Sequence, residues 1–308
     1  MKIVVTGGAG FIGSHLVDAL TKLGHRVLVI DSLVHGKLSN IAASLSKYDF
    51  KKIDICSPKL ERIFKTFKPQ IVFHLAAQTS VPVSLKNPSL DSAVNIGGSV
   101  NVFQSALKVK VNKVIFTSTG GALYGEALVR PTPETYPATP LSPYGIAKLA
   151  AENYLRYFNL THKLKHTILR FSNVYGPRQD PRGEAGVIAI FADKILRNES
   201  PSINGTGQQT RDYVYVGDVV TALIKSMSPK VAGFYNIATQ KETSVIELVT
   251  KINKLSKKNI TPLHRPVIKG EVYRSVLNSN KAKKNLGWKA RVNIDQGLKL
   301  VIQSLKDK

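Results

Sequence analysis

A glycine-rich loop near the amino terminus constrains the fold of this 308-residue chain more than any other feature. The segment TGGAGFIGS follows a short β-branched run at residues 2–6 and precedes a stretch with apolar residues at helical spacing. Gly7, Gly10 and Gly13 match G-x-x-G-x-x-G, a spacing that permits a tight turn and close approach of the backbone to a pyrophosphate. The loop therefore predicts a dinucleotide-binding site, with phosphate at the N-terminus of the following helix.

Acidic and small residues follow the next predicted strands. Asp31 ends the second strand 18 residues after Gly13, where a carboxylate accepts from a ribose 2′-hydroxyl and repels a 2′-phosphate. This position favours NAD over NADP. We expect Asp54, after the third strand, to accept from the adenine amino group. The small residues 75–77 would let the cofactor pass close to the backbone, whereas His74 lacks metal-ligand spacing and is interpreted as a core residue.

Strand-like and helix-like segments alternate over the first 170 residues, which predicts right-handed βαβ units and a parallel sheet. The fold class is therefore α/β, with a doubly wound Rossmann sheet and a smaller, discontinuous C-terminal substrate lobe. We expect residues 1–171 to form the NAD-binding domain, with 211–240 rejoining it. Residues 172–210 and 241–308 would form the lobe over the carboxyl edge of the sheet. Strands are predicted at 2–6, 26–30, 50–53, 70–74, 113–118, 166–171, 211–216 and 233–236, and helices at 11–23, 57–67, 89–109, 142–160 and 187–196.

A candidate catalytic pair lies in the predicted helix 142–160. Tyr144 and Lys148 are four residues apart and so share one helix face. An ammonium beside a phenol favours the phenolate and lowers the pKa of the tyrosine, so Tyr144 could exchange a proton with a substrate hydroxyl near neutral pH. Ser118 and Thr119 end the fifth predicted strand, where a hydroxyl could relay that proton.

Composition narrows the classes of partner. The formal net charge is +24, from 44 Lys and Arg against 20 Asp and Glu. The lysines are scattered, without RGG repeats or zinc-ligand spacing, so we expect no nucleic-acid partner and no metal, but a surface that attracts a phosphorylated ligand. No apolar run reaches the roughly 18–20 residues of a membrane span. Cys56 is the single cysteine and cannot form an internal disulfide, which favours a cytoplasmic location.

The series of motifs resembles the extended short-chain dehydrogenase/reductases and, within them, the UDP-glucose 4-epimerases. Nearly the whole chain takes part, through TGGAGFIGS, HLAA, FTSTGGALYG, YGIAK, RFSNVYGPRQ, RDYVYV and KAKKNLGW. The resemblance implies that Thr119, Tyr144 and Lys148 are catalytic. It implies NAD contacts from Gly7, Gly10, Phe11, Ile12, Gly13, Asp31, Asp54, Ile55, Leu75, Ala76, Ala77, Thr79, Asn95, Tyr144 and Lys148. It implies contacts to a UDP-sugar from Thr119, Tyr144, Asn173, Arg178, Val187, Arg211, Arg274 and Ser275.

The residues after Thr119 bear on the reaction. Dehydratases of the family carry an Asp-Glu pair there and decarboxylases a Glu, whereas this chain has Gly120 and Gly121. Without that carboxylate, the enzyme is expected to oxidise C4 of a UDP-hexose and return the hydride to the other face. Three alternatives stay open: a UDP-glucuronate 4-epimerase, a dehydratase or decarboxylase that draws its acid from elsewhere, and a non-catalytic Rossmann protein that binds nucleotide or RNA.

Two features concern the substrate and the assembly. Residues 268–271 lack the arginine of the subfamily's phosphate-binding element, so Lys269, Arg265 or Arg274 would have to replace it. Lysine has no bidentate fork, which weakens the expected diphosphate contact. Ser275 aligns with a pocket residue that is bulky in some relatives, so the resemblance implies room for an N-acetyl group. The predicted helices 89–109 and 144–160 imply a two-fold homodimer, as in relatives.

Overall fold

The computed structural model describes residues 1–42, 47–183, 186–267 and 272–307. A seven-stranded parallel sheet lies at its centre, in the order β11-β6-β5-β4-β1-β2-β3. This doubly wound order reverses between β1 and β4, the position at which such sheets bind ligands. It confirms the predicted fold class. The strands are β1 (Lys2–Thr6), β2 (Arg26–Asp31), β3 (Tyr48–Lys52), β4 (Ile71–His74), β5 (Lys113–Thr119), β6 (His166–Phe171) and β11 (Gly233–Ile237).

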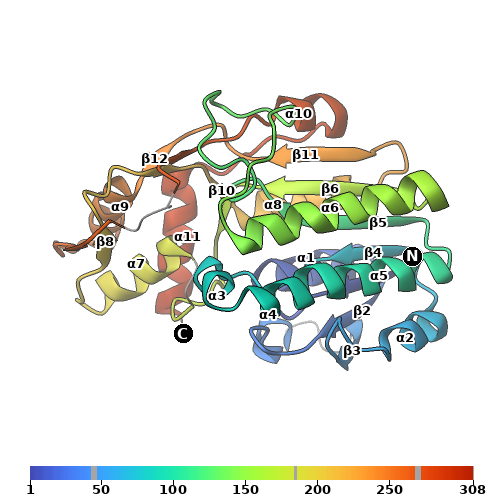
Figure 1. Cartoon of the computed structure of the whole chain (residues 1–308). Helices are drawn as coiled ribbons and strands as arrows, with labels where there is room; N and C mark the ends of the chain where they lie inside the picture. The colour runs from blue at the N-terminus through green and yellow to red at the C-terminus, as the bar shows by residue number, and fades with distance from the viewer. Residues whose placement is uncertain (43–46, 184–185, 268–271, 308) are drawn as a thin grey trace.

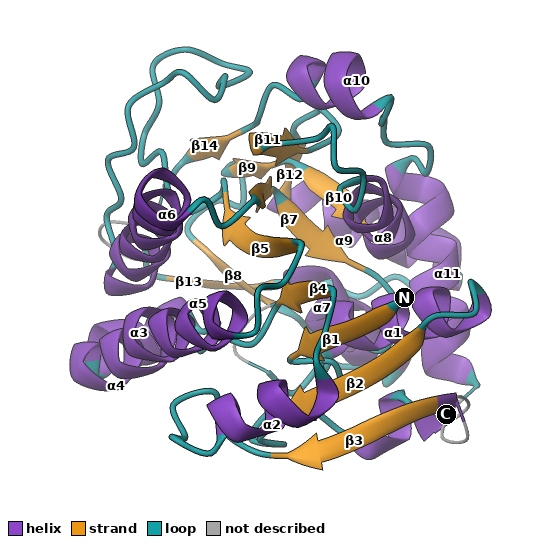
Figure 2. Ribbon diagram, turned by 90° about the vertical axis from the view of Figure 1, so that its right-hand side faces the viewer, coloured by secondary structure: helices purple, strands orange, loops and turns teal. Residues whose placement is uncertain are grey.

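Helices cover both faces of the sheet (Figure 2). On one face lie α1 (Phe11–Lys22) and α8 (Val216–Lys225), and on the other α2 (Leu60–Phe67), α5 (Ser99–Lys108) and α6 (Pro143–His162). Side chains of a strand alternate between faces, so Ile3 and Val5 join the α1 and α8 core while Val4 joins the other. The continuously apolar strands of the sequence are explained by this double coverage.

The helix predicted at 89–109 is divided into several turns of different pitch. Helix α3 (Val81–Lys86) precedes α4 (Pro88–Ser92), which passes through a π-helical segment, η3 (Ala93–Gly98), into α5. Asn87 caps α4, because its side chain accepts from the Leu90 N–H at 3.0 Å. Such π segments are often found at functional sites, and this one carries Asn95.

A second group of helices lies beside the sheet, at the left of Figure 1. Helices α7 (Val187–Leu196), α9 (Val245–Ser256) and α11 (Ile294–Lys306) share a separate apolar core. Three small sheets adjoin them: β10 (Tyr213–Tyr215) with β7 (Asn173–Tyr175), β9 (Thr210–Arg211) with β12 (Thr243–Ser244) and β14 (Arg274–Ser275), and β8 (Ser202–Asn204) with β13 (Leu263–Arg265). Helix α10 (Asn280–Leu286) completes the chain's regular elements.

The strand predicted at 211–216 was expected to rejoin the main sheet, and this expectation is wrong. It is broken into β9 and β10 on either side of Asp212, and both belong to small sheets. The buried Asp212 carboxylate accepts from the backbone N–H groups of Thr239 and Gln240, both at 2.9 Å. Its side chain therefore fastens this segment to the turn after β11, and β11 alone extends the sheet beside β6. The division into two domains stays a prediction.

Among the described helices, none has the length and apolar character needed to cross a bilayer.

Candidate active site

The glycine loop turns tightly beneath the end of β4. Gly7 has φ 71°, and a Cβ there would lie 2.7 Å from the backbone nitrogen of Ala76. A Cβ on Gly13 would lie 2.1 Å from the Gly7 carbonyl oxygen. Helix α1 begins at Phe11, with Gly10 as its N-cap and no capping side chain among the described residues. Its first N–H groups are therefore available to an anionic ligand, as a pyrophosphate site requires.

Asp31 is fixed beside this loop. Its Oδ2 accepts from the Ala9 N–H and its Oδ1 from the Leu33 N–H, both at 2.9 Å. A Cβ on Gly36 would lie 2.6 Å from Oδ1, so the following loop packs directly on the carboxylate. The carboxylate thus stands at the end of β2, next to the phosphate-binding turn, where a ribose hydroxyl would reach it. These residues fit a dinucleotide without a 2′-phosphate.

The expected adenine contacts lie after β3. Asp54 is exposed and accepts from the Cys56 N–H at 2.8 Å, while Ile55 is buried against the neighbouring π segment. His74, by contrast, is fully buried between Thr6 and Ser99, at 2.8 and 3.0 Å. Burial lowers the pKa of His74 to about 3, so this ring is a neutral core residue.

Residues 75–79 continue from β4 along the same edge. Leu75, Ala76 and Ala77 are partly exposed after four buried strand residues, and Thr79 is exposed. Asn95 fastens this segment in the manner of a strand partner: its Oδ1 accepts from the Gln78 N–H at 3.0 Å, and its Nδ2 donates to the Gln78 carbonyl at 2.9 Å. The side chain of Asn95 thereby fixes the path of the backbone at the predicted cofactor edge.

The candidate catalytic residues meet at the carboxyl end of β5. Ser142 caps α6 by accepting from the Gly145 N–H at 3.2 Å, which places Tyr144 in the first turn and Lys148 one turn later. Lys148 Nζ donates to the Thr117 carbonyl at 3.0 Å. Thr119 Oγ1, at the end of the same strand, accepts from the Ala122 N–H at 3.1 Å. One helix start and one strand end therefore position all three groups.

Burial controls the protonation of this pair. Desolvation lowers the pKa of Lys148 to about 8, against the opposing charges of Asp91 and Glu152. Desolvation also raises the pKa of Tyr144, and the charge of Asp91 adds to that rise. The expectation that Lys148 lowers the pKa of the phenol is therefore wrong for this structure, because burial outweighs the attraction of the ammonium.

The sequence reasoning missed Asp91 and Gln78. Asp91 is fully buried, and its Oδ1 accepts from Gln78 Nε2 at 2.7 Å and from Asn95 Nδ2 at 3.0 Å. A signal existed, since Asp91 lies four residues before Asn95, the spacing that places two polar groups on one helix face. Asp91 Oδ2 and the hydroxyl of Ser118 are buried and have no hydrogen-bond partner in the part of the chain that the structure describes.

Several predicted sugar-nucleotide residues also come together. A Cβ on Gly121 would lie 3.3 Å from the Oδ1 atom of Asn173, so Asn173 adjoins the loop after Thr119. The parallel pairing of β14 with β9 sets Ser275 opposite Arg211. The Arg274 side chain, however, is paired with Glu242. Val187 begins α7, the first helix of the second group.

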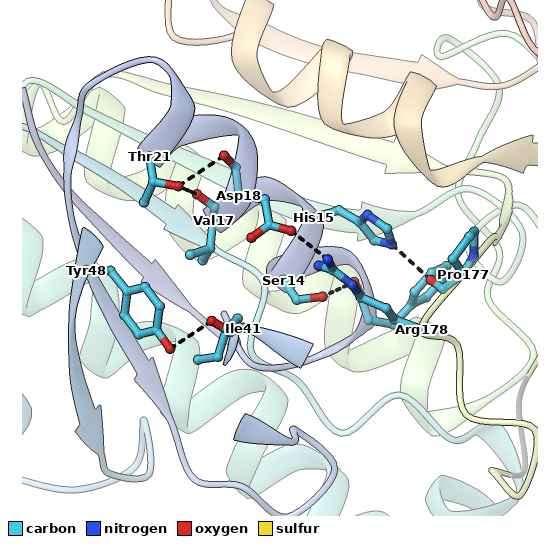
Figure 3. Close-up of polar contacts among 10 residues, drawn as sticks. Ser14, His15, Val17, Asp18, Thr21, Ile41, Tyr48, Pro177 and Arg178 are labelled. Atoms are coloured by element: carbon cyan, nitrogen blue, oxygen red, sulfur yellow. Dashed lines mark hydrogen bonds and ion pairs between the residues drawn. The ribbon is translucent and has the colours of Figure 1, made fainter. Parts of the chain in front are cut away.

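Arg178 is turned toward helix α1 (Figure 3). Its Nη2 lies 2.7 Å from Asp18 Oδ2, while the neighbouring Pro177 carbonyl lies 2.9 Å from His15 Nε2. The residue has φ 68°, a left-handed conformation that directs the side chain away from the course of the loop. The structure thus pairs Arg178 with a carboxylate of the first helix and does not group it with Arg211 and Ser275.

The aligned phosphate-binding element, residues 268–271 with Lys269, lies outside the described residues. Of the other expected substitutes, Arg265 is exposed in β13 beside β8. No group of three His, Cys, Asp or Glu within the described ranges is placed to hold a metal ion.

Comparison with known proteins agrees with this geometry. A sequence model described as the NAD dependent epimerase/dehydratase family matches residues 3–238. The chain belongs to this family.

Individual relatives narrow the likeness. The chain is 40% identical over 311 residues to a UDP-glucose 4-epimerase of Mycolicibacterium smegmatis, covering 100% of this chain and 99% of the relative. The crystal structure of UDP-glucose 4-epimerase with UDP-glucose from Thermotoga maritima is 46% identical, with a TM-score of 0.97 and coverage of 100% and 99%. That of the Thermus thermophilus UDP-glucose 4-epimerase complex with NAD is 39% identical, with a TM-score of 0.93 and 99% of both chains covered.

Proposed function

We propose that this protein is an NAD-dependent UDP-hexose 4-epimerase that interconverts UDP-glucose and UDP-galactose. The observation that carries the proposal is the placement of Tyr144 and Lys148 against the end of β5, where glycines replace the carboxylates of dehydratases and decarboxylases. The site can exchange a proton with a sugar hydroxyl, but it lacks an acid after Thr119 to continue from a 4-keto sugar. Inversion at C4 is the reaction that these groups support best.

The proposed mechanism divides the work between cofactor and protein. NAD, when bound, takes up a hydride from C4 and gives it back. Tyr144 removes the proton of the O4 hydroxyl and later returns it, so that no proton or electron is gained or lost over the cycle. Lys148 as an ammonium stabilises the phenolate, and Thr119 hydrogen-bonds to the same hydroxyl. Inversion requires the 4-keto sugar to turn over before the hydride returns.

The glycine loop, Asp31 and the segment held by Asn95 would bind NAD. Uncapped N–H groups of α1 would face the pyrophosphate, and Asp31 would accept from the ribose 2′-hydroxyl. We propose that Arg211 contributes charge to the diphosphate, with Asn173 and Ser275 near the sugar. The C6 oxidation state is the point on which a UDP-glucuronate 4-epimerase remains the second candidate.

We further propose a homodimer formed through α5 and α6. Both helices run side by side across the front of Figure 1. Large apolar side chains stay exposed on α6: Ile146, Tyr154, Tyr157 and Leu160. Between the helices lies a hollow of about 370 Å³, whose wall includes Tyr154, Tyr157 and Leu107. A two-fold axis would bury this face against itself.

The decisive test incubates purified protein with UDP-galactose and resolves the nucleotide sugars by chromatography. UDP-glucose should appear without net consumption of NAD, and NAD should co-purify with the protein. Parallel reactions with UDP-glucuronate separate the second candidate, and a 4-keto-6-deoxy product would identify a dehydratase. Conversion of none of these substrates, in protein that holds NAD, would contradict the proposal.

A further inference from the structure

We propose that Asp91 is a positioning residue of the active site, which fixes Gln78 and Asn95 through one carboxylate oxygen and holds Lys148 as an ammonium ion through its charge. The proposal rests on the proposed function, because it gives Asp91 a part in the proton transfer by Tyr144. It adds a residue that the motif-based reasoning passed over. The carboxylate acts from behind the reacting groups and is not itself a catalytic residue.

The first line of support is the hydrogen-bond arrangement around Asp91. Oδ1 receives two amide donors, Gln78 Nε2 at 2.7 Å and Asn95 Nδ2 at 3.0 Å. Gln78 also donates from Nε2 to the Ser80 carbonyl at 2.9 Å, and its backbone is paired with Asn95 on both sides. The carboxylate therefore anchors residues 78–80, which continue the segment at the cofactor edge. Two N–H donors on one oxygen favour the ionised form of the carboxyl.

The second line of support is the position of Asp91 relative to α6. A hollow of about 360 Å³ lies between α4 and the start of α6. Its wall includes Asp91 on one side and Pro143 and Ile146 on the other, the residues that flank Tyr144 in the first turn. Asp91 itself is fully buried, so solvent screens its charge little. The carboxylate therefore faces the helix start that carries the catalytic tyrosine.

The third line of support comes from the charged groups around the pair. From α4, Asp91 raises the pKa of both Tyr144 and Lys148. From α6, Glu152 acts on Lys148, but it is paired with Arg170 at 2.6 Å. From β4, His74 is neutral, since burial lowers its pKa to about 3.

Among the described residues, Asp91 is therefore the carboxylate that acts on both groups without a cation of its own in contact. Burial alone would release the Lys148 proton early, and the negative charge of Asp91 opposes this. The same charge holds the Tyr144 proton more firmly. The arrangement gives up some phenolate in exchange for a lysine that stays charged, and that balance is measurable.

The test is Asp91→Asn, in which an amide oxygen can still accept from Gln78 and Asn95 while the charge is lost. Both limbs of the pH profile of kcat should move to lower pH by about one pH unit, because both the phenol and the ammonium lose a stabilised proton. Asp49→Asn is the matched control, since Asp49 is an exposed residue of β3 and its loss changes the net charge equally. Its profile should coincide with that of the wild type.

A second readout needs neither substrate nor turnover. Ultraviolet difference absorbance follows ionised phenol, and subtracting the matching Tyr144→Phe protein isolates the titration of Tyr144. This titration should move to lower pH in Asp91→Asn and stay in place in Asp91→Glu, which keeps the charge. It reports on Asp91 even if UDP-galactose proves not to be a substrate, so failure of this inference and failure of the proposed function are distinguishable.

The outcomes separate the two parts of the role. Gln78→Leu removes a donor without changing the charge, and should weaken NAD retention while leaving both limbs in place. If Asp91→Asn does not fold, Asp91→Ser removes the charge with a smaller side chain. Unshifted limbs and an unshifted phenol titration in a folded, charge-free variant would overturn the proposal and leave Asp91 as a structural residue.

Discussion

The guanidinium of Arg178 lies 2.7 Å from the carboxylate of Asp18 and so ties the loop after β7 to helix α1 (Figure 3). Both side chains are mostly buried, at 28% and 18% exposed. Lys37, in the loop that follows Asp31, is likewise 2.6 Å from Asp180. Two ion pairs thus connect the loop that leads toward α7 with segments around the predicted adenosine site. The resemblance implied a diphosphate contact for Arg178, and the observed pair supplies a competing role.

We expect Arg178→Met and Asp18→Asn each to lower the free energy of unfolding by about 1–3 kcal/mol, because each leaves a half-buried partner unpaired. The double variant should lose less than the sum of the two. Urea unfolding of the four proteins measures this coupling. A KM for UDP-galactose that rises strongly in Arg178→Met, but not in Asp18→Asn, would instead assign Arg178 to the substrate.

Tyr144→Phe should reduce kcat by at least about 10²-fold, since it removes the group that exchanges the O4 proton. The fold and the NAD content should stay unchanged, because the ring still fills its place at the start of α6. Tyr154→Phe is the matched control, an exposed tyrosine of the same helix. Turnover and bound NAD, measured on the same preparations, separate catalysis from cofactor loss. Near-full activity of Tyr144→Phe would exclude the proposed mechanism.

The pH dependence should reflect the buried ammonium of Lys148. Burial lowers the pKa of Lys148 to about 8, so the charged form is lost as pH rises through that value. We expect kcat to decline above about pH 8, since a neutral amine no longer stabilises the phenolate. In Lys148→Arg, the basic limb should disappear because a guanidinium stays charged, even though its altered shape lowers the rate. An activity that still increases at pH 10 in the wild type would contradict this assignment.

Local sequence patterns predicted the sheet and the catalytic pair because both depend on neighbours in the chain. The glycine loop, the alternation of elements and the spacing of Tyr144 and Lys148 are all local. The Tyr144 environment was not accessible in this way, since its raised pKa comes from burial beneath segments distant in sequence. The split at Asp212 was missed for the same reason: its partners Thr239 and Gln240 follow some 30 residues later. Asp91 acts across helices, and only the packed structure brings it to α6.

The proposed homodimer predicts a defined effect of surface charge on α6. Tyr157 is 51% exposed and Leu160 is 70% exposed, a cost that burial against a partner would remove. Tyr157→Glu with Leu160→Asp should convert a dimer to a monomer, as measured by light scattering at micromolar concentration. Leu263→Asp, exposed on β13 and away from these helices, is the control and should stay dimeric. A monomeric wild-type protein would refute the assembly.

Substrate range is predicted from Ser275. This residue is partly exposed in β14, opposite Arg211 of β9. A serine supplies few atoms to exclude a 2-acetamido group. Tyr273 is the neighbour that could fill the space, but its side chain is 55% exposed and its carbonyl is held by the Thr210 N–H at 3.0 Å. We therefore expect the site to accept UDP-N-acetylglucosamine and its galacto epimer besides the plain sugars.

The measurement compares kcat/KM for acetylated and plain substrates in the wild type and in Ser275→Tyr. The larger side chain should lower the ratio by roughly 10-fold or more, the scale on which steric exclusion discriminates, because the phenol ring would occupy the place of the acetyl group. Ser244→Tyr is a suitable control, since Ser244 pairs with the same strand from its other side, and it should leave the ratio near the wild-type value. If the wild type does not convert the acetylated sugar, or if Ser275→Tyr leaves the ratio unchanged, Ser275 does not line the sugar pocket.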